Sequence, residues 1–481
     1  MLPISNSFRF DKSGARKSEN NGNEMTNQNK QPKTVLKARQ VALASAVVLG
    51  ALSLLPAASA QYKDYPQIAG KVQPLHLQQD PSWLSFDMEV RGRSEGQTAF
   101  SYAAGTGQGY ELSRVWGGVS VTPTHWLTGY AQFMDSHALD LPLTYTASNM
   151  RDSFDLRQGY LEAHGESFDV KAGRQELRFG GERLVGISDW TNVSRTFDGF
   201  TARVGDKNHV DLFSASVVTI HPTAFDDHAG GLNFHGAYGT ISTLVPKTSI
   251  EPYVFIKAMP SVKSQQSITG TETEVAPGMR IRGNAPLGFD YTVEGVLERG
   301  SYSNDSIHSG AAYTKLGWTG EHLPWKPRLQ GEYDYATGNP HTDTKRIGTF
   351  DQLYPSSHNG FGLTDLFGWQ NIQQERINLD LNPAKNLTML LQQGFMQVAT
   401  RKDGVYSGSA SETVKPPTAG FASDDIGKEF DASAKYVFHS YIVTNVGVGH
   451  FFPGTVMTEN KHAAPQTIGF LSLTYRFKVS N

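Results

Sequence analysis

The chain has 481 residues, no cysteine, 48 glycines and a charged fraction of 19%. Its formal net charge is −3, and the predicted mature chain, at −8, is too acidic for a general nucleic-acid binder. No stretch after residue 60 is long and apolar enough for a transmembrane helix, so a helical membrane protein is also excluded. No composition break or low-complexity linker follows residue 80, which predicts one large unit rather than several domains.

The first 60 residues have the composition of a secretory signal. Basic residues from Lys30 to Arg39 precede a short apolar run over 41–55, and the segment ends in Ala58-Ser59-Ala60. This order predicts a signal over 1–60, cleaved before Gln61, with Met25 as the true start. A membrane anchor, the alternative, needs about 20 apolar residues. Cleavage would remove 8 basic and 3 acidic residues and leave 35 basic, 43 acidic and a net charge of −8.

The mature chain is predicted to begin with a periplasmic lead over 61–82, followed by a single barrel unit over 83–481. From residue 83 onward apolar and polar residues alternate over stretches of roughly ten residues, which is the period of a β-strand. In 85–93, for example, Phe86, Met88 and Val90 alternate with charged residues. The alternation predicts eighteen strands, at 83–95, 109–122, 126–137, 152–164, 167–178, 196–205, 209–219, 232–244, 250–259, 272–283, 287–300, 309–320, 327–337, 371–382, 387–399, 428–438, 441–452 and 466–478.

The connections between these strands alternate in length. Short turns follow the even-numbered strands, at 123–125, 165–167, 205–208, 284–286, 382–386 and 439–440. Longer loops follow most odd-numbered strands, at 138–151, 179–195, 260–271, 338–370, 400–427 and 453–465. This pattern is typical of an all-β fold, a transmembrane antiparallel β-barrel of about 18 strands with short periplasmic turns and long extracellular loops. Both termini would then lie on the periplasmic side.

Alternation alone does not decide which strand face points inward, and a soluble sandwich would bury its apolar face. A closed barrel that turns its apolar rows to lipid satisfies every backbone group without a free edge. The export signal and a set of aromatic residues near the strand ends favour this arrangement, because such residues form girdles at the membrane interfaces. The set is Trp126, Tyr130, Trp318, Trp325, Tyr335, Tyr436, Phe438, Phe451, Phe452, Tyr475 and Phe477.

Three motifs resemble the bacterial alginate-export family of outer-membrane proteins. They are GRQELRFGGERLVGISDWTNVSRTFDGF (173–200), FDQLYPSSHNGFGLTDLFGWQNI (350–372) and GVGHFFPGT (447–455). The resemblance implies an 18-stranded barrel whose Arg- and Lys-lined lumen conducts a uronic-acid polymer. Two departures stand out. The turn before the last hairpin, which in the alginate exporter is sizeable and helps to plug the pore, is the short His439-Ser440 here, and four residues follow the last aromatic, Phe477.

The stretch Ala172–Phe200 is predicted to form two strands joined by a long loop that carries charge into a confined space. Arg side chains pair with carboxylates through two donors, so rings of Arg and Lys suit an anion path. Asp87, Glu89, Glu332, Asp334, Glu429 and Asp431 are available as neighbouring partners, and Asp189 or Asp198 can order Arg183 or Arg195. The pore-lining candidates are Arg91, Arg93, Arg114, Arg157, Arg174, Arg183, Arg195, Arg280, Arg282, Lys315, Arg328, Lys435 and Arg476.

We expect no cofactor, metal site or catalytic residue. His341, His358 and His450 lack ligand spacing, and the loop over 400–427, whose acidic residues could bind Ca²⁺, has no EF-hand pattern. The sequence thus predicts a Gram-negative outer-membrane channel for anionic saccharides. The alternatives are a porin for small carboxylates or general solutes, an outer-membrane enzyme, and an adhesive barrel with a filled lumen. The expected partners are lipid, an anionic saccharide or carboxylate, the barrel-assembly machinery and periplasmic secretion proteins, without nucleic acid.

Overall fold

The structure, a computed structural model, describes residues 82–99, 102–141, 147–341, 345–358, 360–439, 441–462 and 464–479. The predicted signal over 1–60 and residues 61–81 of the predicted lead lie outside this part of the chain. So does Ser440, so the short turn before the last hairpin is known from its flanking strands alone, which end at His439 and resume at Ile442. No helix among the described residues has the length and apolar character needed to cross a bilayer.

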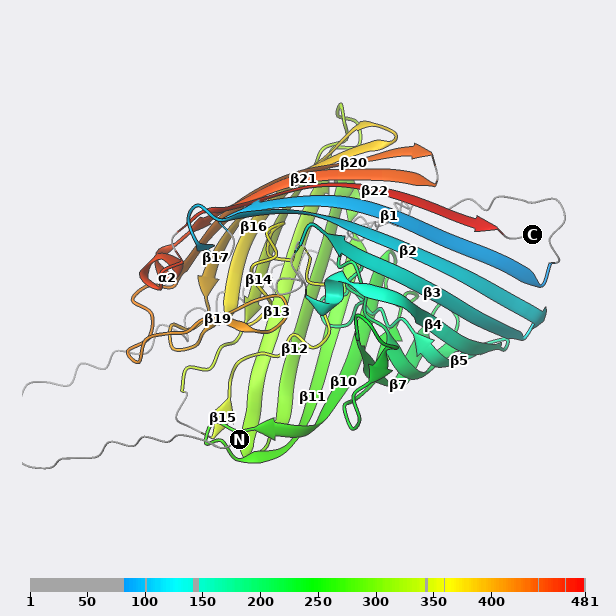
Figure 1. The fold of residues 1–481 in the computed structure, drawn as a ribbon, viewed down its shortest axis with the longest axis horizontal. Helices are drawn as coiled ribbons and strands as arrows, with labels where there is room; N and C mark the ends of the chain where they lie inside the picture. The colour runs from blue at the N-terminus through cyan, green and yellow to red at the C-terminus, as the bar shows by residue number, and fades with distance from the viewer. Residues whose placement is uncertain are drawn as a thin grey trace, which may run out of the picture. The chain divides into compact units, whose positions relative to one another are not determined.

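Eighteen antiparallel strands form a closed β-barrel (Figure 1). Each strand pairs with its neighbour in the chain, and the last strand pairs with the first from Phe86 to Gln97, which closes the sheet. The strands are β1 (Leu84–Thr98), β2 (Gly107–Thr124), β3 (Leu127–Leu139), β4 (Asp152–His164), β5 (Phe168–Gln175), β6 (Phe197–Gly205), β7 (His209–Thr219), β9 (Asn233–Thr240), β10 (Thr248–Lys263), β11 (Thr269–Asn284), β12 (Phe289–Tyr302), β13 (Asp305–Thr319), β14 (Arg328–Ala336), β16 (Ile372–Ala384), β17 (Leu387–Val398), β20 (Asp425–His439), β21 (Ile442–Pro453) and β22 (Gln466–Val479). Each overlaps one predicted strand, so the predicted fold class is confirmed.

Small elements lie in the connections between these strands. Two short strands pair with barrel strands, and two pair with each other as a separate hairpin. A single five-residue α-helix among the described residues precedes the last barrel strand. These elements are β8 (Asp227–His228), β15 (Arg346–Ile347), β18 (Val405–Tyr406), β19 (Glu412–Val414), α2 (Thr455–Glu459) and the 3-10 turns Ser148–Met150 and Pro286–Gly288.

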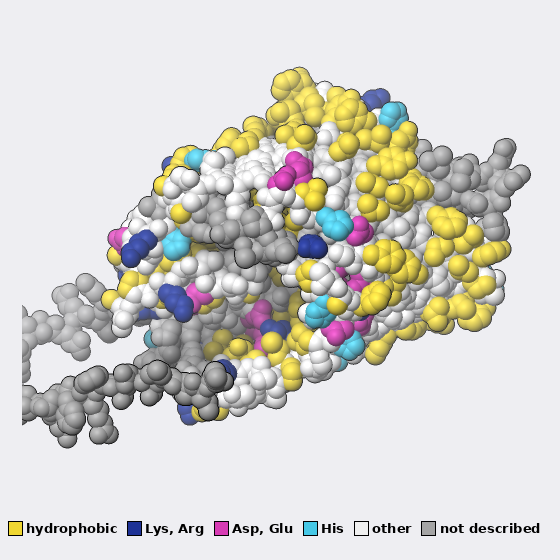
Figure 2. All heavy atoms as spheres, in the orientation of Figure 1, with side chains coloured by type: hydrophobic (Ala, Val, Ile, Leu, Met, Phe, Trp, Pro, Cys, Tyr) yellow, Lys and Arg dark blue, Asp and Glu magenta, His cyan; other side chains and the backbone are white. Residues whose placement is uncertain are grey.

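The strand faces are arranged as the lipid environment requires. On β22, Leu471 and Leu473 are more than half exposed, at 55% and 53%, whereas Ser472 and Thr474 between them are buried. The same inversion recurs on β14, where Leu329 is exposed and Asp334 is fully buried. Hydrophobic side chains accordingly gather on the outer surface, most densely over the half of the barrel that carries the short turns (Figure 2). Their burial in lipid, rather than in a protein core, stabilises the outward rows.

An aromatic girdle marks the short-turn rim. Its members sit in the short turns or at the strand ends beside them, and each exposes more than a third of its surface: Trp83, Trp126, Phe168, Phe289, Trp318, Trp325 and Phe438. Phe451, which the sequence places among interfacial aromatics, instead faces inward and is fully buried against Phe367, with ring centroids 5.1 Å apart. Its position at the long-loop end of β21 puts it beside loops that enter the lumen.

The two rims differ in loop length as predicted. At one rim the strands are joined by turns as short as residues 125–126 and 385–386, whereas at the other the longest connections run over 176–196, 337–371 and 399–424. Several connections depart from this rule. On the long-loop side β10 and β11 are joined by residues 264–268 alone, where a loop over 260–271 was expected, whereas 241–247 and 320–327 on the other rim are longer than that connection. Strands β12 and β13 are joined by residues 303–304 alone on the long-loop side, because the polar stretch at the start of β13 continues the strand pairing back to Asp305.

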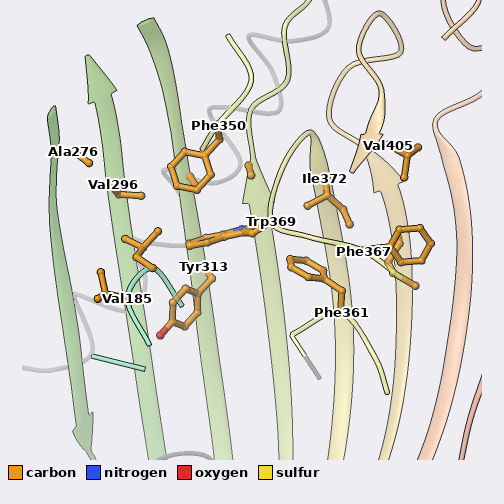
Figure 3. Packing of buried hydrophobic residues seen from close by; sticks show 14 of the residues in the cluster. Val185, Ala276, Val296, Tyr313, Phe350, Phe361, Phe367, Trp369, Ile372 and Val405 are labelled. Carbon is orange, nitrogen blue, oxygen red and sulfur yellow. The ribbon is translucent and has the colours of Figure 1, made fainter. Parts of the chain in front are cut away.

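The lumen of the long-loop half is filled by an apolar cluster rather than by water alone. Strands contribute Phe213, Phe255 and Tyr313, and the loops contribute further aromatic residues such as Phe350 and Trp369. Figure 3 shows the Trp369 ring lying between Phe350 and Tyr313. The ring centroids of these two partners lie 5.4 and 5.9 Å from that of Trp369, both in edge-to-face geometry. This cluster positions the loops described next.

Candidate functional site: a cationic cavity beneath two inner loops

Two long connections fold into the barrel and shape its interior. We call residues 176–196 the first inner loop and residues 337–371 the second inner loop. The first inner loop crosses the lumen and contacts inward-facing residues on opposite parts of the sheet. Asp189 accepts from Arg91 on β1, and Arg183 donates to Glu332 on β14. The sequence-based prediction that this segment carries charge into a confined space is therefore confirmed.

Arginines on the first strands bind the tip of the first inner loop. Arg91 donates to the backbone carbonyls of Asp189 at 2.8 Å and Thr191 at 2.8 Å. Arg114, fully buried, donates to Glu89 and forms an ion pair of 2.9 Å with the Asp189 carboxylate. Burial raises the pKa of Asp189, but the guanidinium groups of Arg114 and Arg91 outweigh it and hold that pKa below its ordinary value.

The indole rings of the site stack on guanidinium groups. Trp116 on β2 lies between Arg114 and Arg157, each with its guanidinium carbon 3.7 Å from the ring centroid. On the first inner loop, Trp190 lies under Arg93 at 3.9 Å and stacks on the imidazole of His358, with centroids 3.7 Å apart. These contacts hold two flat rings in fixed orientations, since cation–π attraction strengthens away from water.

The second inner loop is joined to the first by backbone hydrogen bonds. Tyr354 accepts from Gly186 at 2.9 Å and donates to Leu184 at 2.8 Å, and Ser356 donates to the Glu182 carbonyl at 2.9 Å. Gly186 is required at this crossing, since a Cβ there would lie 2.5 Å from Ser356 Oγ and from the Glu182 carboxylate. The pairing is short and parallel, and it connects the two loops at this one crossing.

Arg195 fixes the same crossing through its guanidinium group. Its Nη1 donates to the carbonyl oxygens of Gly186, Tyr354 and Pro355 at 2.8, 2.7 and 3.0 Å. One side chain at the end of the first inner loop therefore binds the backbone of both loops.

A cavity of about 600 Å³ lies between these loops and the barrel wall. Its lining combines basic groups with flat aromatic rings. The basic residues of its lining are Arg178, Arg183, Arg280, Lys315, Arg376, Arg476 and Lys478; the acidic ones are Asp87, Glu89, Glu182 and Asp189; the aromatic ones are Trp116, Trp190, Tyr313, Phe361, Trp369 and Phe477. Seven basic groups against four acidic ones give this lining a positive balance.

Behind the lining, one buried carboxylate organises three of its cations. Glu332 on β14 pairs with Arg376 at 2.5 Å, with Lys315 at 3.5 Å and with Arg183. Asp334, two residues further along the strand, pairs with Arg183 at 2.5 Å. Three cations therefore share two carboxylates, so the group retains a positive charge while each member is held in place.

The predicted pore-lining residues fall into three groups. Four of them line the cavity: Arg183, Arg280, Lys315 and Arg476. Arg282 lines a smaller cavity of about 250 Å³ with Arg203 and His209. Five others bind the inner loops: Arg91, Arg93, Arg114, Arg157 and Arg195. Two pair with residues of other strands, Arg174 with Asp198 at 2.8 Å and Arg328 with Asp290 at 2.7 Å. Lys435 lies half-buried on β20.

The prediction that Asp189 or Asp198 holds Arg183 or Arg195 in place is wrong. Asp189 binds Arg114 and lies 3.6 Å from Arg476, whereas Asp198 binds Arg174. Neither orders Arg183 or Arg195, because those two side chains reach across the lumen to β14 and to the second inner loop. Of the other suggested acidic partners, Asp87 accepts from Tyr130 and Gln132; Glu429 accepts from Thr364.

Arg376, which holds a central place in the cation group of the lining, was not among the predicted pore-lining residues. It lies on a strand with clear alternation, where Gln374, Arg376 and Asn378 share the buried polar face. The alternation along that strand therefore indicated that the Arg376 side chain faces inward. The aromatic lining, in contrast, comes largely from loops, which have no periodicity to indicate where a ring points.

Comparison with known proteins bears on this barrel and cavity directly. Residues 82–470 match the family described as Alginate export. The chain belongs to the alginate-export family. The match extends over nearly all the described barrel, which confirms the resemblance predicted from the three motifs. No curated protein matches the chain in sequence.

Solved structures with a similar fold come from two bacteria, and one of these proteins, Pseudomonas aeruginosa OpdK, is described as an outer-membrane protein. Pseudomonas aeruginosa OccK11 (OpdR) is similar with a TM-score of 0.56 and 11% identity, covering 86% of this chain and 99% of that one. Acinetobacter baumannii OccAB2 has a TM-score of 0.57 and 7% identity, covering 83% and 100%. P. aeruginosa OpdK with vanillate has a TM-score of 0.56 and 11% identity, covering 82% and 98%. The family match thus shows the family, and the solved structures show that the barrel fold is shared.

Proposed function

We propose that this alginate-export family member conducts carboxylate-bearing solutes through its lumen and that the cavity beneath the inner loops is the selective part of the path. The observation that carries the proposal is the cation group of Arg183, Lys315 and Arg376 around Glu332, placed beside Trp369 and Tyr313. Arg presents a planar pair of donors to a carboxylate, and an aromatic face stacks on a sugar or benzene ring.

The size of the cavity favours a small solute in the conformation described. About 600 Å³ is within the range of pockets that enclose a small molecule. A single uronate or a short oligosaccharide of uronates meets both the charge and the volume, as does an aromatic carboxylate of the kind present in the OpdK–vanillate structure. Small carboxylates are therefore the substrate class that the geometry supports best.

Export of an alginate-type polymer is the second candidate, and membership of the alginate-export family favours it. A polymer needs a continuous opening, whereas the apolar cluster and the paired inner loops occupy the long-loop half of the lumen. Polymer passage would thus require displacement of both loops together. The short connection between β20 and β21 provides no plug of the kind found at that turn in the alginate exporter.

Planar-bilayer recording separates these candidates. We expect anion selectivity from the reversal potential in a salt gradient, and reversible block of single-channel current by galacturonate and vanillate but not by glucose. Small-carboxylate conduction predicts block by the monomers from either side, whereas polymer export predicts block by alginate oligomers and none by monomers.

The contribution of the cation group is tested by R376Q, with R401Q as a matched control. Arg401 is exposed on the 399–424 loop, donates to a backbone carbonyl there and is not part of the cavity lining, so its loss changes the net charge equally without removing a lining group. We expect R376Q to weaken galacturonate block several-fold and R401Q to leave it unchanged. Cation selectivity of the wild-type channel, with no block by any of these anions, would overturn the proposal.

A further inference from the structure

Three carboxylates meet at the long-loop rim, apart from the cavity. Asp152 and Asp155 belong to β4, and Asp226 lies in the connection that follows β7. A carboxylate oxygen of each lies within 4.8 Å of the other two, and Asp152 and Asp155 are buried. We call these three residues the rim triad.

The backbone around the rim triad explains how the carboxylates come together. Residues three apart on a regular strand face opposite sides, but β4 has register irregularities against β3 on both sides of Asp155, and Phe154 has a φ of 23°. The bulge therefore turns both aspartates to one face. The loop is fastened onto them: Asp226 N donates to Asp155 Oδ2 at 2.6 Å, and Ser153 N donates to Pro222 O at 3.3 Å.

The observation that points to a ligand is that the Asp152 carboxylate is buried without a hydrogen-bond partner in the described part of the chain. It is 0% exposed, and neither of its carboxylate oxygens has a hydrogen-bond partner among the described residues. Asp155 and Asp226, in contrast, each accept backbone hydrogen bonds. Burying a carboxylate whose two oxygens accept no hydrogen bond costs free energy unless a cation or another donor supplies the missing contacts. The Asp152 carboxylate also lies close to two more carboxylates, which repel it.

No side chain of the residues that the structure describes donates a hydrogen bond to the Asp152 carboxylate. Among the described residues, the one Lys or Arg side chain that pairs with the rim triad is Arg174, at 4.0 Å from Asp155, and its guanidinium group binds Asp198 at 2.8 and 3.0 Å. A second acidic cluster of Glu272, Glu274 and Asp351 shows the contrast. There Lys257 inserts its ammonium group, 3.1 Å from Glu272 and paired with Asp351.

We propose that the rim triad of Asp152, Asp155 and Asp226 binds a divalent cation, Ca²⁺, which fastens the loop after β7 to strand β4. The donors are all oxygens, and Ca²⁺ accepts irregular arrangements of carboxylates and water, whereas Mg²⁺ demands near-ideal octahedral geometry. Three formal negative charges and the unpartnered Asp152 carboxylate are the features that recruit the ion. Sites of this kind in extracellular modules bind Ca²⁺ with dissociation constants on the order of 10⁻⁴–10⁻³ M.

The test uses the full mature protein in detergent, stripped with chelator and dialysed, with radioactive Ca²⁺ alone as the probe in equilibrium dialysis. We expect saturable binding in that concentration range, weaker competition by Mg²⁺, and a loss of at least tenfold in affinity in D152N. D226N, which changes the loop rather than the strand, should lose affinity similarly. E274Q is the matched control, because it neutralises one acid of the cluster that Lys257 already serves, and it should bind as wild type does.

Folding of each variant is checked by heat-modifiable gel migration and by melting in chelator. D152N should melt in chelator at the wild-type temperature or above it, since the substitution removes a repulsive buried charge. Ca²⁺ should raise the melting temperature of wild type and of E274Q, but not that of D152N. Absence of saturable binding up to 10 mM, on the order of ten times the weakest expected constant, would overturn the proposal. So would equal affinity in folded D152N and wild type, or loss of the binding in E274Q.

Discussion

Replacement of Arg195 by Ala should release the two inner loops from each other while leaving the barrel intact. The three carbonyl oxygens of Gly186, Tyr354 and Pro355 accept from a single nitrogen, Nη1. That nitrogen carries two N–H groups, so the cluster amounts to about two full hydrogen bonds from a charged donor. At about 1.5–3 kcal/mol for each, the gross loss is about 3–6 kcal/mol.

The lower figure is the better guide, because Arg195 is only half-buried and water can reach part of the site once the side chain is gone. About 3 kcal/mol corresponds to an increase on the order of 100-fold in the population of separated loops. R195A should therefore show larger or noisier single-channel currents than wild type, and faster hydrogen exchange at the Gly186 and Tyr354 amides. R195K, which retains a charged donor, should be intermediate. Currents and exchange rates in R195A equal to those of wild type would show that Arg195 does not fasten the loops.

Two further substitutions probe the charges of the site. Because Asp189 has a pKa below its ordinary value, its contribution to loop anchoring is fully present at neutral pH and is lost as pH falls below the ordinary carboxyl range of about 4. The channel current of the wild type should therefore rise on strong acidification. D189N should show the raised current already at pH 7, with no further response to acid. E332Q removes the carboxylate shared by Arg183, Arg376 and Lys315. One charge at about 4 Å in water is worth about 1 kcal/mol, so chloride-over-potassium selectivity should rise about fivefold at low salt. An unchanged reversal potential in folded E332Q would contradict the assignment of this group to the conduction path.

The strand pattern was predictable because alternate residues of a barrel strand face lipid and lumen, so apolar and polar residues alternate in the sequence. Leu329 and Asp334 face opposite sides of the sheet for the same reason that Leu471 and Ser472 do. Strand ends were less predictable. The start of β13 at Asp305 was missed, because polar residues there carry no apolar alternation and are placed only by their pairing with β12.

The interior of the barrel could be anticipated only in part. Strand parity identifies inward cations such as Arg280, but which of them reach the cavity and which fasten loops depends on contacts across the lumen. Phe350 and Trp369 lie in an aperiodic loop, so the apolar cluster that they form leaves no sequence signal. The rim triad was hidden for another reason: Asp226 is far from Asp152 in sequence, and a sequence search for ligand spacing finds no metal site there.

The central claim, that the cavity lies on the conduction path, is tested most directly by charge placed at Ser357. This residue lines the cavity, and the chain has no cysteine, so S357C creates a unique thiol. Modification by an anionic methanethiosulfonate should reduce single-channel current and anion selectivity, while the same modification of S409C, exposed on the 399–424 loop, should change neither. Complete modification of S357C with unaltered current and reversal potential would place the conduction path elsewhere and contradict the account.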